Sequence, residues 1–227
     1  MGTKATGALL AALILMFSGE DAMHHASTAR IELPEIQTDS GVSVEEAIEQ
    51  RRSVREYADT PVKLADLAQL LWSAQGITDP AGLRAAPSAG ALYPLEVYVV
   101  AGNVASLPPG VYHYLPRGNK LERVAPEDRR RALADVALDQ APVREAPAVL
   151  LMGGVYERTT RKYGQRGIRY VHMEAGHAGQ NVFLQAETLG LATVTIGAFE
   201  DDGVRKVANL PANVNPLYLM PVGHPRE

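Results

Sequence analysis

Apolar residues recur at helical spacing in three stretches of the chain. The first opens at Thr60 and Pro61 and is closed by Gly76, with apolar residues three and four positions apart; these are Leu67, Leu70, Leu71 and Ala74. A shorter helix is predicted over residues 44–51. Ser43 would be its N-cap and Glu46 its capping-box partner, and its apolar face would carry Val44, Ala47 and Ile48.

The longest helix is predicted over residues 170–189, and Gly190 would end it. Its buried stripe is expected to comprise Val171, Ala175, Ala178, Val182 and Leu189. A further helix should open at Pro126 with acidic residues in its first turn, and a short one should end near residue 209. Residues 158–169 read as a basic connection.

Continuous or alternating apolar runs predict the strands. Residues 95–101, 111–115 and 121–124 follow one another across turn signals, which is typical of antiparallel hairpins. Residues 148–155 form an unbroken apolar run, which favours a central strand buried on both faces. Residues 191–197 and 217–222 complete the set. Helices and strands together predict one α+β domain over residues 43–227.

The N-terminus differs from the rest. Lys4 precedes a short apolar run, residues 8–17, which has the shape of a secretory signal or N-terminal anchor over residues 1–20. Such a segment would mean export, with possible membrane contact; a misassigned start or a simple tail would leave the protein cytoplasmic. Residues 21–42 are polar and irregular, as in a linker or wrapping arm.

Composition narrows the function classes. The 227 residues carry a net charge of −4, which argues against non-specific nucleic-acid binding. The absence of cysteine excludes thiolate catalysis and cysteine-ligated metals. His172 and His177 are five residues apart, whereas the two histidines of a zinc-protease helix are four residues apart. Glu174 and His177 form one Glu-x-x-His motif, but a di-iron site needs a second one, which the chain does not contain. We therefore predict no metal. Gly-x-Ser-x-Gly, Gly-x-Gly-x-x-Gly and P-loop motifs are also absent.

The strongest candidate chemistry is a basic corner formed by Arg51, Arg52, Ser53 and Arg55. Guanidinium groups offer paired donors that suit phosphate, and Ser53 adds a neutral donor. The alternative is a solvated basic patch that closes a helix. A cation near the pyrimidine edge of a flavin would stabilise its reduced form, and Arg55 is placed to supply one.

A flat ring would also need a floor without bulky side chains. The small-residue loop, Pro87, Ser88, Ala89 and Gly90, supplies one. A backbone donor to the flavin N5 could come from the turn at residues 195–198. None of these features is specific by itself, but their order along the chain favours a flavin site.

Four motifs make the chain resemble the nitroreductase family, and its SagB-type branch in particular, which includes the dehydrogenases of thiazole/oxazole-modified peptides. They are Arg-Arg-Ser-Val-Arg at 51–55, Pro-Ser-Ala-Gly-Ala-Leu-Tyr-Pro-Leu-Glu-Val at 87–97, Glu-Ala-Gly-His-Ala-Gly-Gln-Asn at 174–181 and Thr-Ile-Gly-Ala-Phe at 195–199. The resemblance covers residues 44–225. It implies a mixed, mostly antiparallel sheet flanked by helices, and an obligate homodimer with FMN at the subunit interface.

The resemblance also implies residue roles. Arg51 and Ser53 would meet the phosphate and ribityl chain, with help from Arg52, and Arg55 would face the pyrimidine edge. The small-residue loop would come from the partner subunit. One face of the ring would be covered by Ile196, Gly197 and Ala198. Arg226, after the last strand, would be a phosphate ligand.

Three functions remain open. The favoured one is an FMN-dependent oxidoreductase that moves hydride between NAD(P)H, or another donor, and a small substrate. The second is a dehydrogenase of azoline rings in peptides, because Lys162 and Tyr163 match a Lys-Tyr pair implicated in proton removal in such enzymes. The pair could equally be a basic loop at the cavity rim. The third is a ligand-binding scaffold without redox turnover, against which the intact Arg51, Ser53 and Arg55 argue.

Overall fold

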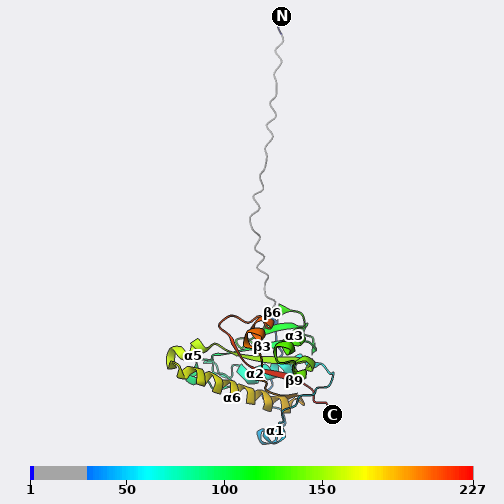
Figure 1. Cartoon of the computed structure of the whole chain (residues 1–227), viewed down its shortest axis with the longest axis vertical. Coiled ribbons are helices and arrows are strands. Elements are labelled where there is room, and N and C mark those ends of the chain that lie inside the picture. Colours follow the sequence, from blue (N-terminus) through cyan, green and yellow to red (C-terminus); the bar gives the residue numbers. More distant parts are fainter. Residues whose placement is uncertain (3–29, 227) are drawn as a thin grey trace.

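The computed structural model describes residues 1–2 and 30–226. Its centre is a seven-stranded sheet in which every neighbouring pair is antiparallel. The strand order is β1 (Arg30–Glu32), β6 (Lys120–Pro126), β5 (Gly110–Leu115), β3 (Leu95–Ala101), β7 (Ala148–Gly154), β9 (Asn215–Gly223) and β8 (Ala192–Thr193). A parallel pair, β2 (Val62–Lys63) and β4 (Val104–Ala105), lies apart from it. The predicted α+β class with a mostly antiparallel sheet flanked by helices is confirmed (Figure 1).

Helices cover both faces of the sheet. Strand β7 is buried along its whole length, as predicted for a central strand. Leu150 and Met152 face the core layer that contains α2 (Leu64–Gln75) and α6 (Arg166–Thr188). Val149 and Leu151 face the opposite layer, built with α3 (Arg130–Val136), α4 (Ala141–Glu145) and α7 (Asp201–Val207). The two-residue period of a strand therefore divides one apolar run between two cores.

The predicted signal or anchor, residues 1–20, lies outside the described residues except for the first two. Residues 21–29 of the predicted arm also lie outside them. From residue 30 the chain is described, and β1 extends the sheet by pairing with β6. Among the described residues, no helix is both long and apolar enough to cross a bilayer.

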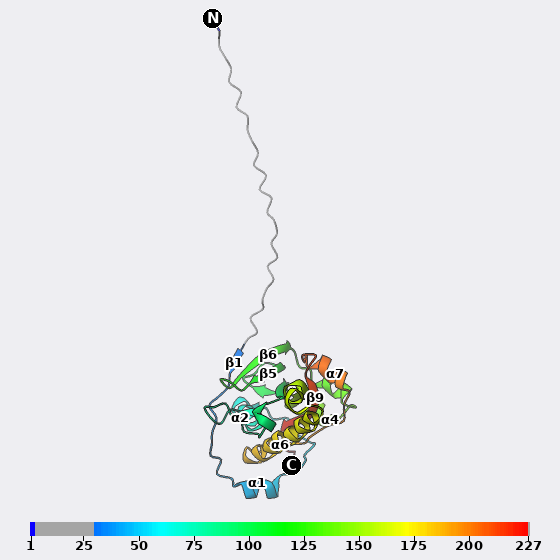
Figure 2. The same cartoon turned by 90° about the vertical axis from the view of Figure 1, so that its left-hand side faces the viewer.

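Helix α1 (Val44–Gln50) begins as predicted, because the Ser43 hydroxyl accepts a hydrogen bond from the Glu46 amide at 3.1 Å. Its apolar face does not enter the core. Ala47 is buried, but Val44 and Ile48 are 63% and 56% exposed. The helix lies at the periphery, beyond α6, in both views (Figures 1 and 2). The sequence pattern thus identified an apolar face that has no cover within the described chain.

The start of α2 and the role of Gly76 differ from the prediction. Val62 and Lys63 form β2, so the helix opens at Leu64 and not at Pro61. Gly76 does end it, but with φ −62° and not in the left-handed region. A Cβ at Gly76 would lie 2.1 Å from Cδ1 of Trp72. Close packing under the indole therefore explains the glycine.

The helix predicted at Pro126 was also wrong. Pro126 is the last residue of β6, and Glu127 has φ +72°, which a helix cannot accommodate. Helix α3 begins only at Arg130, where the Asp128 carboxylate accepts the Arg130 amide at 3.0 Å.

Two further segments differ from the prediction. The basic connection over residues 158–169 is mostly helical, formed by α5 (Tyr156–Tyr163) and the first turn of α6. The strand predicted over residues 191–197 is limited to β8, and Ile196 instead makes a separate bridge to Leu219. On α6, four members of the predicted stripe are buried, but Leu189 is only half-buried.

Candidate functional site

The basic corner follows directly after α1 and is fixed by backbone contacts. The Val54 amide donates to the Thr193 carbonyl at 3.0 Å, and Ser53 bridges Thr193 in parallel, so the corner runs along β8. Arg51 caps α1, and its guanidinium carbon lies 5.0 Å from the centre of the Phe183 ring on α6. The corner is therefore attached to the sheet edge and to α6.

The cations of this corner are available to a ligand. Within the described residues, Arg51, Arg52 and Arg55 form no ion pair with a carboxylate. Arg52 donates only to the Glu49 and Arg51 carbonyls, at 2.7 and 2.9 Å, and Arg55 makes a long bond of 3.5 Å to the Ser53 carbonyl. Arg52, Ser53 and Arg55 are exposed. Such a set of donors suits an oxyanion.

The C-terminus brings Arg226 to the same region. Residues 56–58 pair with the chain end: the Ala58 amide donates to His224 at 2.9 Å and the Arg226 amide donates to Glu56 at 3.2 Å. The Arg226 side chain donates to the Tyr57 carbonyl at 3.1 Å. The Tyr57 hydroxyl donates to the Val54 carbonyl at 2.8 Å, which stiffens the corner. Burial raises the pKa of Tyr57 well above its usual value, so it stays a neutral donor.

The segment predicted to cover a ring face divides into a buried and an exposed part. Ile196 is 6% exposed, and its backbone exchanges two hydrogen bonds with Leu219, at 2.8 and 2.9 Å. Its side chain belongs to the core. Gly197 and Ala198 are exposed, and the Ala198 carbonyl accepts from Gln140 at 2.9 Å. A ring could therefore meet the backbone of Gly197 and Ala198 but not the Ile196 side chain.

The small-residue loop lies elsewhere and meets the Lys-Tyr pair. Its last two residues enter the short 3-10 turn η1 (Ala89–Ala91), where Gly90 has φ +65°. A Cβ at Gly90 would lie 2.7 Å from the Tyr163 hydroxyl and 2.9 Å from Lys162 Nζ. The fold thus brings the loop, Lys162 and Tyr163 together, although they are far apart in sequence.

The pair itself sits at the C-terminal end of α5. Lys162 is exposed, not buried, and its Nζ lies 5.4 Å from the centre of the Tyr163 ring. Tyr163 packs edge-on against Tyr170, with ring centres 5.2 Å apart. Both polar tips therefore reach the open side of the loop.

Beneath the loop lies Glu174, which sequence reasoning did not assign to the site. The Ser88 hydroxyl donates to Glu174 Oε2 at 2.5 Å, and the Tyr93 amide donates to Ser88 Oγ at 2.9 Å. Glu174 is only 2% exposed. Burial raises the pKa of this carboxyl to about 7, against the lowering effect of the Ser88 hydrogen bond and the Arg84 charge.

The structure gives no support to a metal site around Glu174. His172 and His177 point to the exposed side of α6 while Glu174 is buried, so the three do not converge. No cluster suited to a metal ion occurs in the described ranges. The available signal was its place beside Val171, Ala175 and Ala178 in the buried stripe of α6.

The basic corner and the small-residue loop contact α6 at different positions along the helix. Helix α6 contacts both, through Phe183 at the corner and Glu174 at the loop. These residues are nine positions apart, which corresponds to roughly 14 Å along the helix and to opposite helical faces. Each group is open to solvent on its own side.

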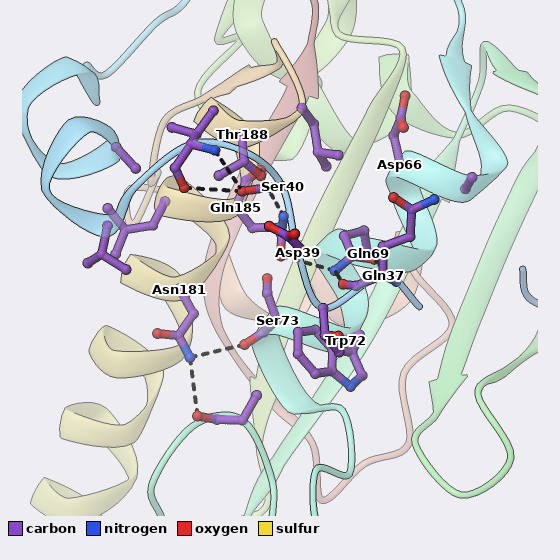
Figure 3. A pocket seen from close by; sticks show the side chains of 18 of the residues that line it. Gln37, Asp39, Ser40, Asp66, Gln69, Trp72, Ser73, Asn181, Gln185 and Thr188 are labelled. Carbon is purple, nitrogen blue, oxygen red and sulfur yellow. Dashed lines mark hydrogen bonds between the residues drawn. The ribbon is translucent and has the colours of Figure 1, made fainter. Parts of the chain in front are cut away.

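A cavity of about 510 Å³ lies between residues 35–44, α2 and the C-terminal half of α6 (Figure 3). Gln69 holds the Gln37 backbone there with two hydrogen bonds, 3.1 and 2.7 Å long, and donates to Gln185 at 3.2 Å. Trp72 is only partly buried and lines this cavity. None of the predicted site residues lines this cavity. The candidate site is therefore identified from the functional groups of the basic corner and the small-residue loop, and not from the volume of the cavity.

The family model described as Nitroreductase family matches residues 48–224. The chain belongs to the nitroreductase family. That match spans the basic corner, the small-residue loop, the Lys-Tyr pair and Glu174, so all of these belong to the family domain.

Relatives agree with this assignment. A Methanocaldococcus jannaschii protein described as a nitroreductase is 46% identical over 200 residues, covering 88% of this chain and 98% of that protein. The microcin B17-processing protein McbC of Escherichia coli is 32% identical over 165 residues, covering 70% of this chain and 61% of McbC. A solved structure from Ralstonia eutropha, described as a nitroreductase, superposes with a TM-score of 0.76 at 24% identity, over 87% of this chain and 90% of that one, which supports the fold.

Proposed function

We propose that this nitroreductase-family oxidoreductase depends on FMN and moves hydride between NAD(P)H, or another donor, and a small substrate. The observation that carries the proposal is the basic corner, whose arginines lack carboxylate partners among the described residues and are held in place along β8. Arg51, Ser53 and Arg226 would hold the phosphate end, and Arg55 the pyrimidine edge. Bound FMN would supply the hydride-accepting and hydride-donating chemistry.

The small-residue loop also fits a flat ring. At Gly90 the absence of a side chain lets the tips of Lys162 and Tyr163 approach the loop backbone closely. Gly197 and Ala198 leave backbone exposed near the corner. A flavin requires a cationic group for its phosphate and exposed backbone against its ring. The basic corner supplies the first, and the small-residue loop together with Gly197 and Ala198 supplies the second.

We further propose that the site is completed by a second copy. In one chain, the corner and the loop contact α6 at Phe183 and Glu174, which lie roughly 14 Å apart along the helix; a second copy would bring another loop to each corner. Apolar groups without cover support an interface: Met173 on α6 is 52% exposed, and Val44 and Ile48 on α1 are more so. In a dimer with two-fold symmetry, the corner of each copy would meet the loop of the other, so two complete sites would form.

A second candidate is a dehydrogenase acting on azoline rings in peptides. It is favoured by the contact of Lys162 and Tyr163 with Gly90, and by the similarity to McbC, a microcin-processing protein. In that reaction the Lys162 amine or the Tyr163 phenolate would take the ring proton while hydride leaves. In the first candidate the same groups orient the substrate.

The deciding experiment uses the purified protein with FMN under anaerobic conditions. Bleaching of the bound flavin by NADH or NADPH supports the first candidate. Bleaching by an azoline peptide, with both nucleotides inactive, replaces it with the second. A protein that binds no FMN contradicts both and leaves a ligand-binding scaffold.

A further inference from the structure

The most unusual buried group outside the flavin-binding residues is Glu174. Its carboxyl is 2% exposed, and one oxygen, Oε1, is buried without a hydrogen-bond partner within the described residues. The other oxygen accepts from Ser88 at 2.5 Å. A carboxylate in such a place loses hydration without full compensation, so the neutral acid is favoured.

The surroundings contain little opposing charge. Arg84, on the loop after α2, is the charged group that acts on Glu174, and it is itself engaged: it donates to Gln75 at 2.7 Å and stacks 4.6 Å from the centre of the Tyr93 ring. Ser88 is the hydrogen-bonding group. Burial outweighs both and sets the pKa of Glu174 to about 7, where the group can both give and take a proton.

Ser88 is the route from this acid to the site. Its Oγ already accepts the Tyr93 amide at 2.9 Å, so its position is fixed while its own proton can turn. When Glu174 is ionised, Ser88 donates to it. When Glu174 is protonated, Ser88 can accept from the acid and donate outwards, two residues from Gly90 and its neighbours Lys162 and Tyr163.

We propose that Glu174 is the proton store of this active site and delivers its proton through the Ser88 hydroxyl to the substrate that is being reduced. The proposal rests on the proposed function, because that function places the small-residue loop, which includes Ser88, against the flavin ring where the substrate would bind. Glu174 touches no substrate and acts as a relay residue behind Ser88.

The step balances as a proton transfer that accompanies hydride transfer. Bound FMN would supply the acceptor with a hydride that originates from NAD(P)H, and the acceptor would then be more basic. The Ser88 O–H bond breaks as the acceptor's new bond to hydrogen forms, and the Glu174 O–H bond breaks as the Ser88 hydroxyl is restored. Glu174 is left as a carboxylate that accepts from Ser88, and solvent protonates it again after product leaves.

The first test observes Glu174 itself and needs no flavin. Carbon-13 NMR of the glutamate-labelled protein should show one carboxyl titrating near neutral pH, and Glu174→Gln should remove it. In Ser88→Ala the hydrogen bond that favours the carboxylate is lost, so the same carboxyl should titrate at higher pH. A carboxyl that titrates like an exposed glutamate, or that ignores Ser88→Ala, overturns the proposal.

The second test is the pH profile of substrate reduction by the FMN-loaded protein. In the wild type the rate should fall as pH rises through about 7, because Glu174 must be protonated to act. Glu174→Gln and Ser88→Ala should both lose this limb and lower the rate on the order of a hundredfold. Thr159→Val is the matched control, since Thr159 is also buried with an unpartnered hydroxyl but lies in α5.

The outcomes separate the two proposals. A shifted carboxyl that responds to Ser88→Ala, in a protein that takes up no FMN, contradicts the proposed function but not the coupling of Glu174 to Ser88. FMN reduction with a wild-type pH limb that both variants retain contradicts the relay and leaves the proposed function standing. Two variants are used so that misfolding of Glu174→Gln still leaves Ser88→Ala to decide.

Discussion

The basic corner and the small-residue loop solve opposite physical problems. The corner presents charges to solvent and is held by backbone contacts with β8 and with the chain end. The loop presents almost no side chain to solvent and is held by a hydroxyl bonded to a buried acid. Exposed charged side chains are oriented only if the backbone that carries them is rigid. A loop without large side chains has few packing contacts of its own, so buried groups beneath it must hold it in position. Each region can therefore be altered by substitution while the other is left intact.

The largest expected effect is on stability and comes from the acid beneath the loop. The folded-state pKa of Glu174, about 7, lies above the ordinary value of 4.5, so the folded state binds more protons between these values. The stabilisation contributed by Glu174 is therefore fully present below pH 4.5 and is lost as pH rises to about 7. The loss should total about 3 kcal/mol, and Glu174→Gln should abolish it.

Chemical denaturation at several pH values measures this slope. Glu200→Gln is the control, because Glu200 is exposed and should leave the slope unchanged. An equal slope in wild type and Glu174→Gln would show that the buried acid is not the source.

The next effect concerns the loop. Gly90→Ala places a methyl group against the tips of Lys162 and Tyr163, which must move, while the protein should still fold. Displacing groups at a reactive centre by about an ångström costs roughly a hundredfold in rate. Gly41→Ala is a matched control, because Gly41 has a similar φ of +70° but no atom within 4 Å of a new Cβ. Equal activity losses in both variants would assign the effect to backbone strain alone.

A substitution in the basic corner should give the smallest of the three expected effects. Arg51→Ala removes a charged hydrogen bond worth about 1.5–3 kcal/mol, so FMN affinity should fall roughly ten- to a hundredfold. Quenching of FMN fluorescence measures the affinity. Arg117→Ala, an exposed arginine in the turn between β5 and β6, should bind FMN like the wild type. Unchanged affinity in Arg51→Ala would refute the phosphate assignment.

The two regions also differ in how well the sequence predicted them. The corner was recognisable because adjacent arginines carry their chemistry in their side chains, and the Ser43 cap that precedes it was confirmed. Strand β3 was predicted to the residue, and β7 nearly so, because their apolar runs are bounded by turns and loops. Local chemistry and hydrophobic pattern sufficed for these elements.

What failed depended on tertiary contacts. The positive φ of Glu127 overrode the helix signals at Pro126. The apolar face of α1 predicted burial that the described chain does not provide. The position of Glu174 in the buried stripe of α6 indicated burial but not its partner, because the contact with Ser88 exists only where α6 passes under the loop. Likewise, only the fold places Lys162 and Tyr163 beside Gly90.

The central claim is that each site joins the corner of one copy to the loop of another, and mixing two defective variants tests it most directly. Arg51→Ala and Gly90→Ala chains, carrying different affinity tags, would be co-expressed and the mixed species isolated. Activity would be assayed at an FMN concentration that leaves Arg51→Ala empty. The account predicts that the mixed species regains one of its two sites, and thus about half of wild-type activity. Activity no higher than the mean of the two separate variants would contradict it, because corner and loop would then serve the same chain.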